Sequence, residues 1–287
     1  MKQIKYVVSA EEAGLKIKDI LRNKLSISAA VLTKLKKSKR GILCNGEEVF
    51  AVKRVCDGDE IEINLADERS ANIVPAKVKL DIIHEDEDIL VVNKPRSMPT
   101  HPSQNHHSDS LANAVVGYYS DCPFTFRVIT RLDKDTSGVV IIAKNKISAG
   151  ILTEQMTKKE IEKEYVALCH GVPQIRCGII DAPIARKAGS AILREVNPLG
   201  KEAVTYYEVM ESGKNLSVVK LIPKTGRTHQ IRVHLSHIGF PIYGDDLYGS
   251  KVKNEKVRLH CRKIRLIHPI SKEKMEFTAQ IPKDMEI

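Results

Sequence analysis

The sequence predicts an α+β fold in two domains, and three observations lead to this prediction. The chain has 287 residues, which exceeds the usual size of a single domain. Candidate strands and helices follow one another in mixed order, without the regular strand–helix alternation of a parallel α/β sheet. A polar stretch that ends in a proline, residues 67–76, divides the chain. We therefore expect a small domain at residues 1–66, a linker at 67–76 and a larger domain at 77–287.

The first 65 residues predict two short helices followed by a hairpin. Residues 2–9 alternate like a strand, and apolar residues recur at helical spacing from Leu15 to Leu25. Ser28 is a suitable N-cap for a second helix, which ends in a run of cationic residues. Asn45-Gly46 predicts a tight turn, with residues 49–55 forming the second strand of the hairpin.

The larger domain predicts a mixed sheet with a few helices. Its apolar and β-branched runs predict strands at residues 80–83, 89–92, 139–144, 164–170, 203–209 and 216–222. Helices are expected at residues 111–119 and 148–159, and after a polar turn within residues 225–235.

Composition limits the classes of partner. The net charge of +10 indicates a polyanion, with nucleic acid ahead of a membrane surface, although lysines dispersed over a soluble protein also account for it. The six cysteines show no paired CxxC spacing, which signals neither a zinc site nor a disulfide framework. The N-terminus lacks the apolar run of a signal peptide, and no stretch is long enough to cross a bilayer. We expect a reduced, cytoplasmic protein.

The segment Arg131-Leu132-Asp133-Lys134-Asp135-Thr136-Ser137-Gly138 is a charged turn that runs directly into an apolar strand. A strand fixes what the preceding loop presents, so such edges often carry sites. Asp133 has two interpretations. It caps the turn through side-chain hydrogen bonds, or it is an ionised carboxylate that requires a cationic partner. Arg131 and Arg227 could each be that partner, and the residues alone do not choose.

Residues 14–65 resemble the small RNA-binding domain first seen in the small-subunit ribosomal protein S-four. The helix–helix–hairpin order, the Asn45-Gly46 turn and Gly58-Asp59-x-Ile61 carry the resemblance. It implies that the cationic end of the second helix contacts an RNA phosphate backbone, where the alternative is a solvated helix end. The residues concerned are Lys34, Lys36, Lys37, Lys39 and Arg40.

Residues 80–282 resemble the RluA-type pseudouridine synthases over essentially the whole domain. Residues 131–138 match the central motif of that family, Lys163-x-Tyr165 its tyrosine motif, and residues 226–232 its later basic motif. Weaker matches are Asn93-Lys94-Pro95, His101-Pro102, Pro241-x-x-Gly244-Asp245 and His268-Pro269. Thr130 departs from the pattern, because many members have histidine there. That position varies in the family, so we still expect activity.

This second resemblance implies that uridine in RNA is isomerised to pseudouridine. Asp133 is the implied essential carboxylate, acting at the ribose as nucleophile or as base. Tyr165 is implied to stack on the uracil, and Arg227 to pair with Asp133. Arg131 is implied to enter the RNA stack when the target base is flipped out. His229 and Arg232, in the basic motif, are expected to contact RNA.

No cofactor is expected, because the isomerisation transfers no electrons. His229, His234 and His237 do not follow a known metal-ligand spacing, so no metal is expected either. The expected partner is RNA, with large-subunit ribosomal RNA as the first choice. We expect the protein to be a monomer and to have no membrane partner. Alternatives are the same reaction on transfer RNA, a synthase of the related RsuA type, or a non-catalytic RNA-binding or ribosome-assembly factor.

Overall fold

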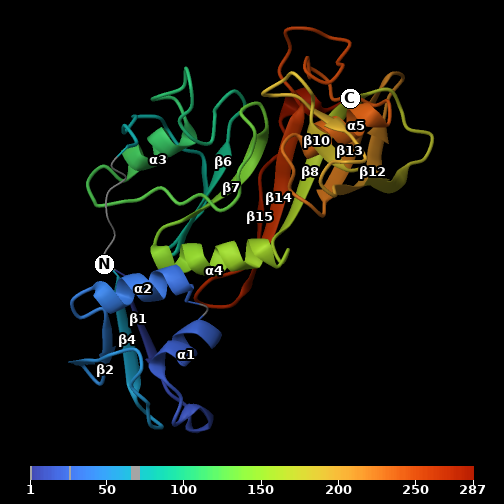
Figure 1. Ribbon diagram of the computed structural model, residues 1–287. Coiled ribbons are helices and arrows are strands. Elements are labelled where there is room, and N and C mark those ends of the chain that lie inside the picture. The colour runs from blue at the N-terminus through green and yellow to red at the C-terminus, as the bar shows by residue number, and fades with distance from the viewer. Residues whose placement is uncertain (1, 26, 66–71) are drawn as a thin grey trace.

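Figure 1 shows a computed structural model of the chain, which describes residues 2–25, 27–65 and 72–287. The fold is α+β, as the sequence predicts, and its two main sheets belong to different parts of the chain. The predicted linker lies partly outside the described residues, so its boundaries stay predictions. Within the described residues, no helix is long and apolar enough to span a bilayer.

The N-terminal part is a four-stranded antiparallel sheet with two helices. The sheet order is β1-β4-β2-β3. Its elements are β1 (Lys2–Val7), η1 (Ala10–Glu12), α1 (Ile17–Asn23), α2 (Ala29–Lys37), β2 (Ile42–Cys44), β3 (Glu47–Glu48) and β4 (Glu60–Leu65). The predicted cap of α2 is confirmed, since Ser28 Oγ accepts a hydrogen bond from the Val31 amide at 3.3 Å. The Asn45-Gly46 turn is also confirmed, with φ of 54° and 81°.

The predicted strand at residues 49–55 is wrong. The second strand of the hairpin is only β3. The segment beyond it serves α1 instead, because the carbonyl groups of Lys53 and Ala51 accept hydrogen bonds from the amides of Ile17 and Lys18 at 3.0 and 2.9 Å. Those amides open the helix and have no partner within it, so the segment that satisfies them leaves the ladder.

The large sheet is mixed and has nine strands. Its order is β5-β6-β7-β14-β8-β13-β12-β9, with β15 paired to β14. The strands are β5 (Ile82–Glu85), β6 (Ile89–Lys94), β7 (Ser137–Ala143), β8 (Glu162–His170), β9 (Cys177–Asp181), β12 (Val204–Ser212), β13 (Leu216–Pro223), β14 (Leu259–Ile267) and β15 (Lys274–Thr278). A separate pair is β10 (Ile184–Arg186) with β11 (Arg194–Val196), and the helices are α3 (Leu111–Tyr118), α4 (Lys146–Thr157), α5 (Gln230–His237) and η2 (Lys283–Met285).

Helix α4 joins the two parts, because it lies between the large sheet and the N-terminal unit (Figure 1). Ile147 and Ile151 of α4 are buried in the same apolar cluster as Ile17, Ile20 and Leu35 of the N-terminal unit. The N-terminal unit is therefore packed on the larger part and shares a core with it.

The centre of the sheet brings β7 beside β14, and this pair is parallel. Gly138 makes the approach possible. It has φ of 117°, and a Cβ there would overlap the backbone of Cys261 on β14. The glycine that ends the central motif thus sets the turn carrying Asp133 against the middle of the sheet.

Candidate active site

A cleft of about 750 Å³ opens over the middle of the large sheet. Its walls come from the turn before β7, the end of α4, strand β8 and the loop that leads into α5. The cleft brings together every second-domain residue that the sequence placed at the site, although these residues lie up to about a hundred positions apart in the chain. They are Arg131, Asp133, Tyr165, Arg227, His229 and Arg232.

The turn that carries Asp133 is held from outside. Thr100 donates a hydrogen bond to the Leu132 carbonyl at 2.7 Å, and the Lys94 ammonium donates to the Lys134 carbonyl at 3.1 Å. Lys94 is fully buried and also donates to the Met98 carbonyl at 2.7 Å. Burial lowers its pKa to about 8 against the attraction of nearby aspartates. Asp133 itself keeps a third of its side chain exposed to the cleft.

The cationic partner of Asp133 is Arg232. Nη1 of Arg232 lies 4.0 Å from Oδ2 of Asp133. The same guanidinium donates from Nε and Nη2 to the two oxygens of Asp245, both at 2.7 Å. Asp245 is fully buried, so this two-point contact fixes the direction in which the free nitrogen faces.

The expected pairing of Arg227 with Asp133 is therefore corrected. Arg227 is exposed on the cleft wall, and its Nε donates to the Glu202 carbonyl at 2.9 Å. Gln230 explains this placement, because its side-chain oxygen accepts the Arg227 amide at 3.0 Å and holds the loop before α5. Within the described part of the chain, the basic groups within 4.0 Å of the Asp133 carboxylate are the imidazole of His229 and the guanidinium of Arg232.

His229 approaches Asp133 from the first residue before α5. Its Nε2 lies 3.9 Å from Oδ2 of Asp133, and its Nδ1 lies 2.8 Å from the hydroxyl of Tyr248. Burial lowers the pKa of His229, a shift that Asp133 opposes and Arg232 supports, so the ring tends to be neutral. At 3.9 Å, Nε2 is too far from the carboxylate for a direct hydrogen bond. The hydrogen bond that orients the ring is the one between Nδ1 and the Tyr248 hydroxyl.

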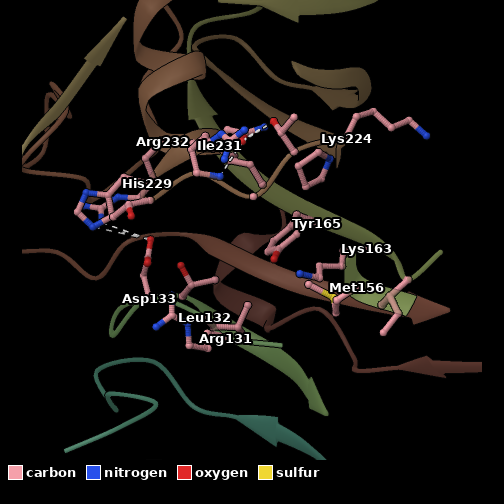
Figure 2. A pocket seen from close by; sticks show the side chains of 18 of the residues that line it. Arg131, Leu132, Asp133, Met156, Lys163, Tyr165, Lys224, His229, Ile231 and Arg232 are labelled. Carbon is pink, nitrogen blue, oxygen red and sulfur yellow. Dashed lines mark hydrogen bonds and ion pairs between the residues drawn. The ribbon is translucent and has the colours of Figure 1, made fainter. Parts of the chain in front are cut away.

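Tyr165 faces the cleft from β8, opposite Cys261 of β14. Only 8% of the residue is exposed. Burial raises the pKa of Tyr165 well above its usual value, and the charges of Cys261 and Asp133 add to that. The ring is therefore a neutral phenol in a position to cover one face of a planar ligand. Figure 2 shows Tyr165 and Asp133 on facing walls of the cleft.

Arg131 and the cations of the N-terminal unit lie at the surface. Arg131 is exposed on the cleft wall, next to the buried Leu132. The cationic residues at the end of α2 are all exposed and do not line the cleft. They are Lys34, Lys36, Lys37, Lys39 and Arg40.

Sequence reasoning missed four residues of the site. Lys163 and His101 line the cleft, while Asp245 and Tyr248 hold Arg232 and His229 in place. Lys163, His101 and Asp245 belong to motifs that match the family. Lys163 could have been predicted from its position two residues before Tyr165, since alternate residues of a strand face the same side. Tyr248 gave no such signal.

The histidines His229, His234 and His237 are not among the groups of described residues that have the spacing to hold a metal ion. His234 is buried and faces Thr205 Oγ1 at 2.9 Å and the Ala182 carbonyl at 3.0 Å. Among the described residues, one group has the spacing to hold a metal ion, namely Asp86, Asp88 and His268. None of the three lines the cleft.

Comparisons with known proteins agree with this geometry. Residues 88–237 match the family described as RNA pseudouridylate synthase. The uncharacterised RNA pseudouridine synthase YhcT of Bacillus subtilis (strain 168) is 35% identical over 289 residues, which cover 99% of this chain and 95% of that protein. Ribosomal large subunit pseudouridine synthase D of Escherichia coli (strain K12) is 37% identical, over 85% of this chain and 80% of that protein. Among solved structures, human RNA pseudouridylate synthase domain containing 1 matches with a TM-score of 0.61 and 28% identity, covering 71% of this chain and 84% of that one.

Proposed function

The chain belongs to the RNA pseudouridylate synthase family, and from this premise we propose that it isomerises uridines of large-subunit ribosomal RNA with Asp133 as the essential carboxylate. One observation supports Asp133 above all. Its carboxylate opens into the cleft, and Arg232 and His229 face it at 4.0 and 3.9 Å. Arg232 thus supplies a positive charge beside the carboxylate that the chemistry requires.

The reaction breaks the bond between ribose C1′ and uracil N1, then joins C1′ to carbon 5 of the turned ring, which loses its hydrogen as a proton while N1 gains one. Asp133 either attacks C1′ or takes the proton from C2′, and both routes need an ionised oxygen at the sugar. The logic is close to glycoside cleavage, where a carboxylate supports an electron-poor anomeric carbon. Tyr165 stacks on the uracil and keeps it in the cleft while it turns.

RNA reaches this site through base flipping, since the glycosidic bond of a stacked nucleotide is inaccessible. Arg131, exposed at the cleft wall, takes the place of the flipped base. Arg227, which is held on the cleft wall by the Glu202 carbonyl, contacts the RNA beside Arg131. The exposed cations at the end of α2 contact the phosphate backbone.

The name of the Escherichia coli relative, ribosomal large subunit pseudouridine synthase D, favours large-subunit ribosomal RNA as the substrate. The similarity to that protein extends over most of both chains. The resemblance of residues 14–65 to a ribosomal RNA-binding domain supports the same choice. Action on ribosomal RNA also accords with a cytoplasmic location.

The test is pseudouridine mapping in total RNA from cells that lack this chain. We expect pseudouridines to be missing from large-subunit ribosomal RNA, to return with the wild-type gene and to stay absent with Asp133→Asn. The Asp133→Asn protein should bind the RNA with unchanged affinity. Losses confined to transfer RNA contradict the ribosomal substrate. If Asp133→Asn restores the pseudouridines, the role of the carboxylate is contradicted. If Asp133→Asn restores only the growth of cells that lack the chain, and not the pseudouridines, the protein acts as an assembly factor.

A further inference from the structure

Lys163 is a cation inside the cleft without a protein partner. Its side chain is partly buried in the cleft wall, and within residues 2–25, 27–65 and 72–287 its ammonium makes no hydrogen bond or ion pair. Neighbouring charges are paired: Arg262 faces Glu164 at 3.7 Å, and Lys263 faces Glu276 at 2.8 Å. Burial lowers the pKa of Lys163, so its charged form is destabilised until an anion arrives.

The position of Lys163 connects it with Tyr165. Both extend from β8 into the cleft, as Figure 2 shows, while Glu164 between them faces the other side. Alternate residues of a strand are about 6.5 to 7 Å apart, which suits a lysine that reaches the edge of a ring stacked on the tyrosine. Met156 and Ile161 line the same end of the cleft with apolar surface.

The reaction produces an anion at this place. When the bond between C1′ and N1 breaks, its electron pair passes to the uracil ring, and the charge spreads to the carbonyl oxygens O2 and O4. We propose that the Lys163 ammonium donates a hydrogen bond to one of these oxygens and stabilises the detached ring. This inference rests on the proposed function, because it requires that uracil leaves at Asp133. No bond to Lys163 forms, and its proton stays on nitrogen.

A phosphate of the RNA is the other anion to consider. Phosphates remain at the surface of a bound RNA, and the exposed cations Arg131, Lys224 and Arg227 of the cleft wall are placed for them. Lys163 lies instead beside apolar side chains and the buried Tyr165. Those surroundings suit a planar base, and they strengthen a single hydrogen bond to a charged oxygen.

The experiment compares full-length wild type with Lys163→Met and Lys163→Arg, using ribosomal RNA from cells that lack the chain. We expect Lys163→Met to lower the single-turnover rate at saturating RNA by about 100-fold, the usual effect of removing one such donor. Lys163→Arg should retain more of the rate, because it keeps a cation. RNA affinity should stay within about twofold, since the charge is needed after the base is cleaved.

Thermal unfolding separates this role from a structural one. Removing an unpaired, partly buried charge should leave the unfolding temperature of Lys163→Met unchanged or raise it. Lys274→Met is the matched control. It removes one exposed charge from β15, outside the cleft, and should match wild type in rate.

Two outcomes overturn the inference. One is a Lys163→Met rate within about threefold of wild type. The other is a weaker affinity and a flatter salt dependence with the rate intact, which would identify a phosphate contact. Asp133→Asn is run alongside: if it is inactive while Lys163→Met is fully active, only the Lys163 inference fails. If Asp133→Asn is active, the proposed function fails. Should Lys163→Met not fold, Lys163→Gln carries the same criteria.

Discussion

Nη1 of Arg232 faces Oδ2 of Asp133 at 4.0 Å, while the other nitrogens of this guanidinium are committed to Asp245. Arg232 thus lies between two carboxylates. Asp245, which is buried, holds the guanidinium in place, and the guanidinium in turn presents a positive charge to Asp133 in the cleft. Because Asp245 is fully buried, its charge requires this partner, and the guanidinium cannot turn away.

The first prediction contrasts Arg232 with Arg227. Arg232→Lys should lower the single-turnover rate by about 100-fold. A lysine keeps the charge but cannot hold Asp245 at two points while facing Asp133, and misplacement by about 1 Å has an effect of that size. Arg227→Lys, the matched control, should change this rate at saturating RNA by less than about threefold. Greater damage from Arg227→Lys would restore Arg227 as the partner.

The choice between Arg227 and Arg232 shows which part of the site could be predicted from the sequence and which part could not. The motifs located Arg131, Asp133 and Tyr165 in one cleft, because each motif is local and each joins a recognisable strand or turn. Which arginine faces Asp133 depends on a contact between residues that are far from that motif. Asp245 holds the guanidinium of Arg232, and only the folded chain shows this contact.

Strand β14 was not among the predicted strands, because its sequence pattern also depends on partners elsewhere in the chain. Strand β14 lies near the centre of the sheet but carries Arg262, Lys263 and Arg265, so its apolar pattern is interrupted. Glutamates on β8 and β15 pair with these cations. A single-chain reading of hydrophobicity cannot include partners on other strands.

The second prediction concerns Tyr248, whose hydroxyl faces Nδ1 of His229 and accepts the Arg194 amide at 3.0 Å. Tyr248→Phe keeps the ring that packs against Arg232 and removes only the hydroxyl. The imidazole of His229 then loses the hydrogen bond that orients it beside Asp133. We expect the single-turnover rate to fall by about tenfold, the effect of one lost hydrogen bond. An unchanged rate would show that the orientation of His229 does not matter.

The third prediction addresses the end of α2, where Lys34, Lys36 and Lys37 are exposed. Replacing all three by glutamine should weaken RNA binding and lower the slope of log affinity against log salt by about 2 to 3, if each contacts one phosphate. The single-turnover rate at saturating RNA should remain as in wild type. Substitution is preferable to deleting residues 1–66, because deletion exposes Ile147 and Ile151 of α4. An unaltered salt slope counts against RNA docking by this unit.

The fourth prediction is the acid dependence of stability through His260. This histidine is 1% exposed on β14, with Nδ1 at 2.9 Å from the Ser137 hydroxyl at the end of the central motif. Burial lowers the pKa of His260 from 6.5 to about 4, helped by the charges of Arg96 and Arg262. Between these values the unfolded chain binds the proton more readily, so stability present above pH 6.5 is lost as pH falls toward 4. The loss amounts to about 3 kcal/mol.

Denaturant unfolding at a series of pH values checks this assignment. His260→Gln should flatten the fall in unfolding free energy between pH 6.5 and 4, because glutamine takes up no proton there. His237→Gln, at an exposed histidine, is the matched control and should follow wild type. The other buried histidines contribute equally to all three proteins, so the difference isolates His260. Parallel curves for His260→Gln and wild type would mean that protonation of His260 does not drive the acid loss.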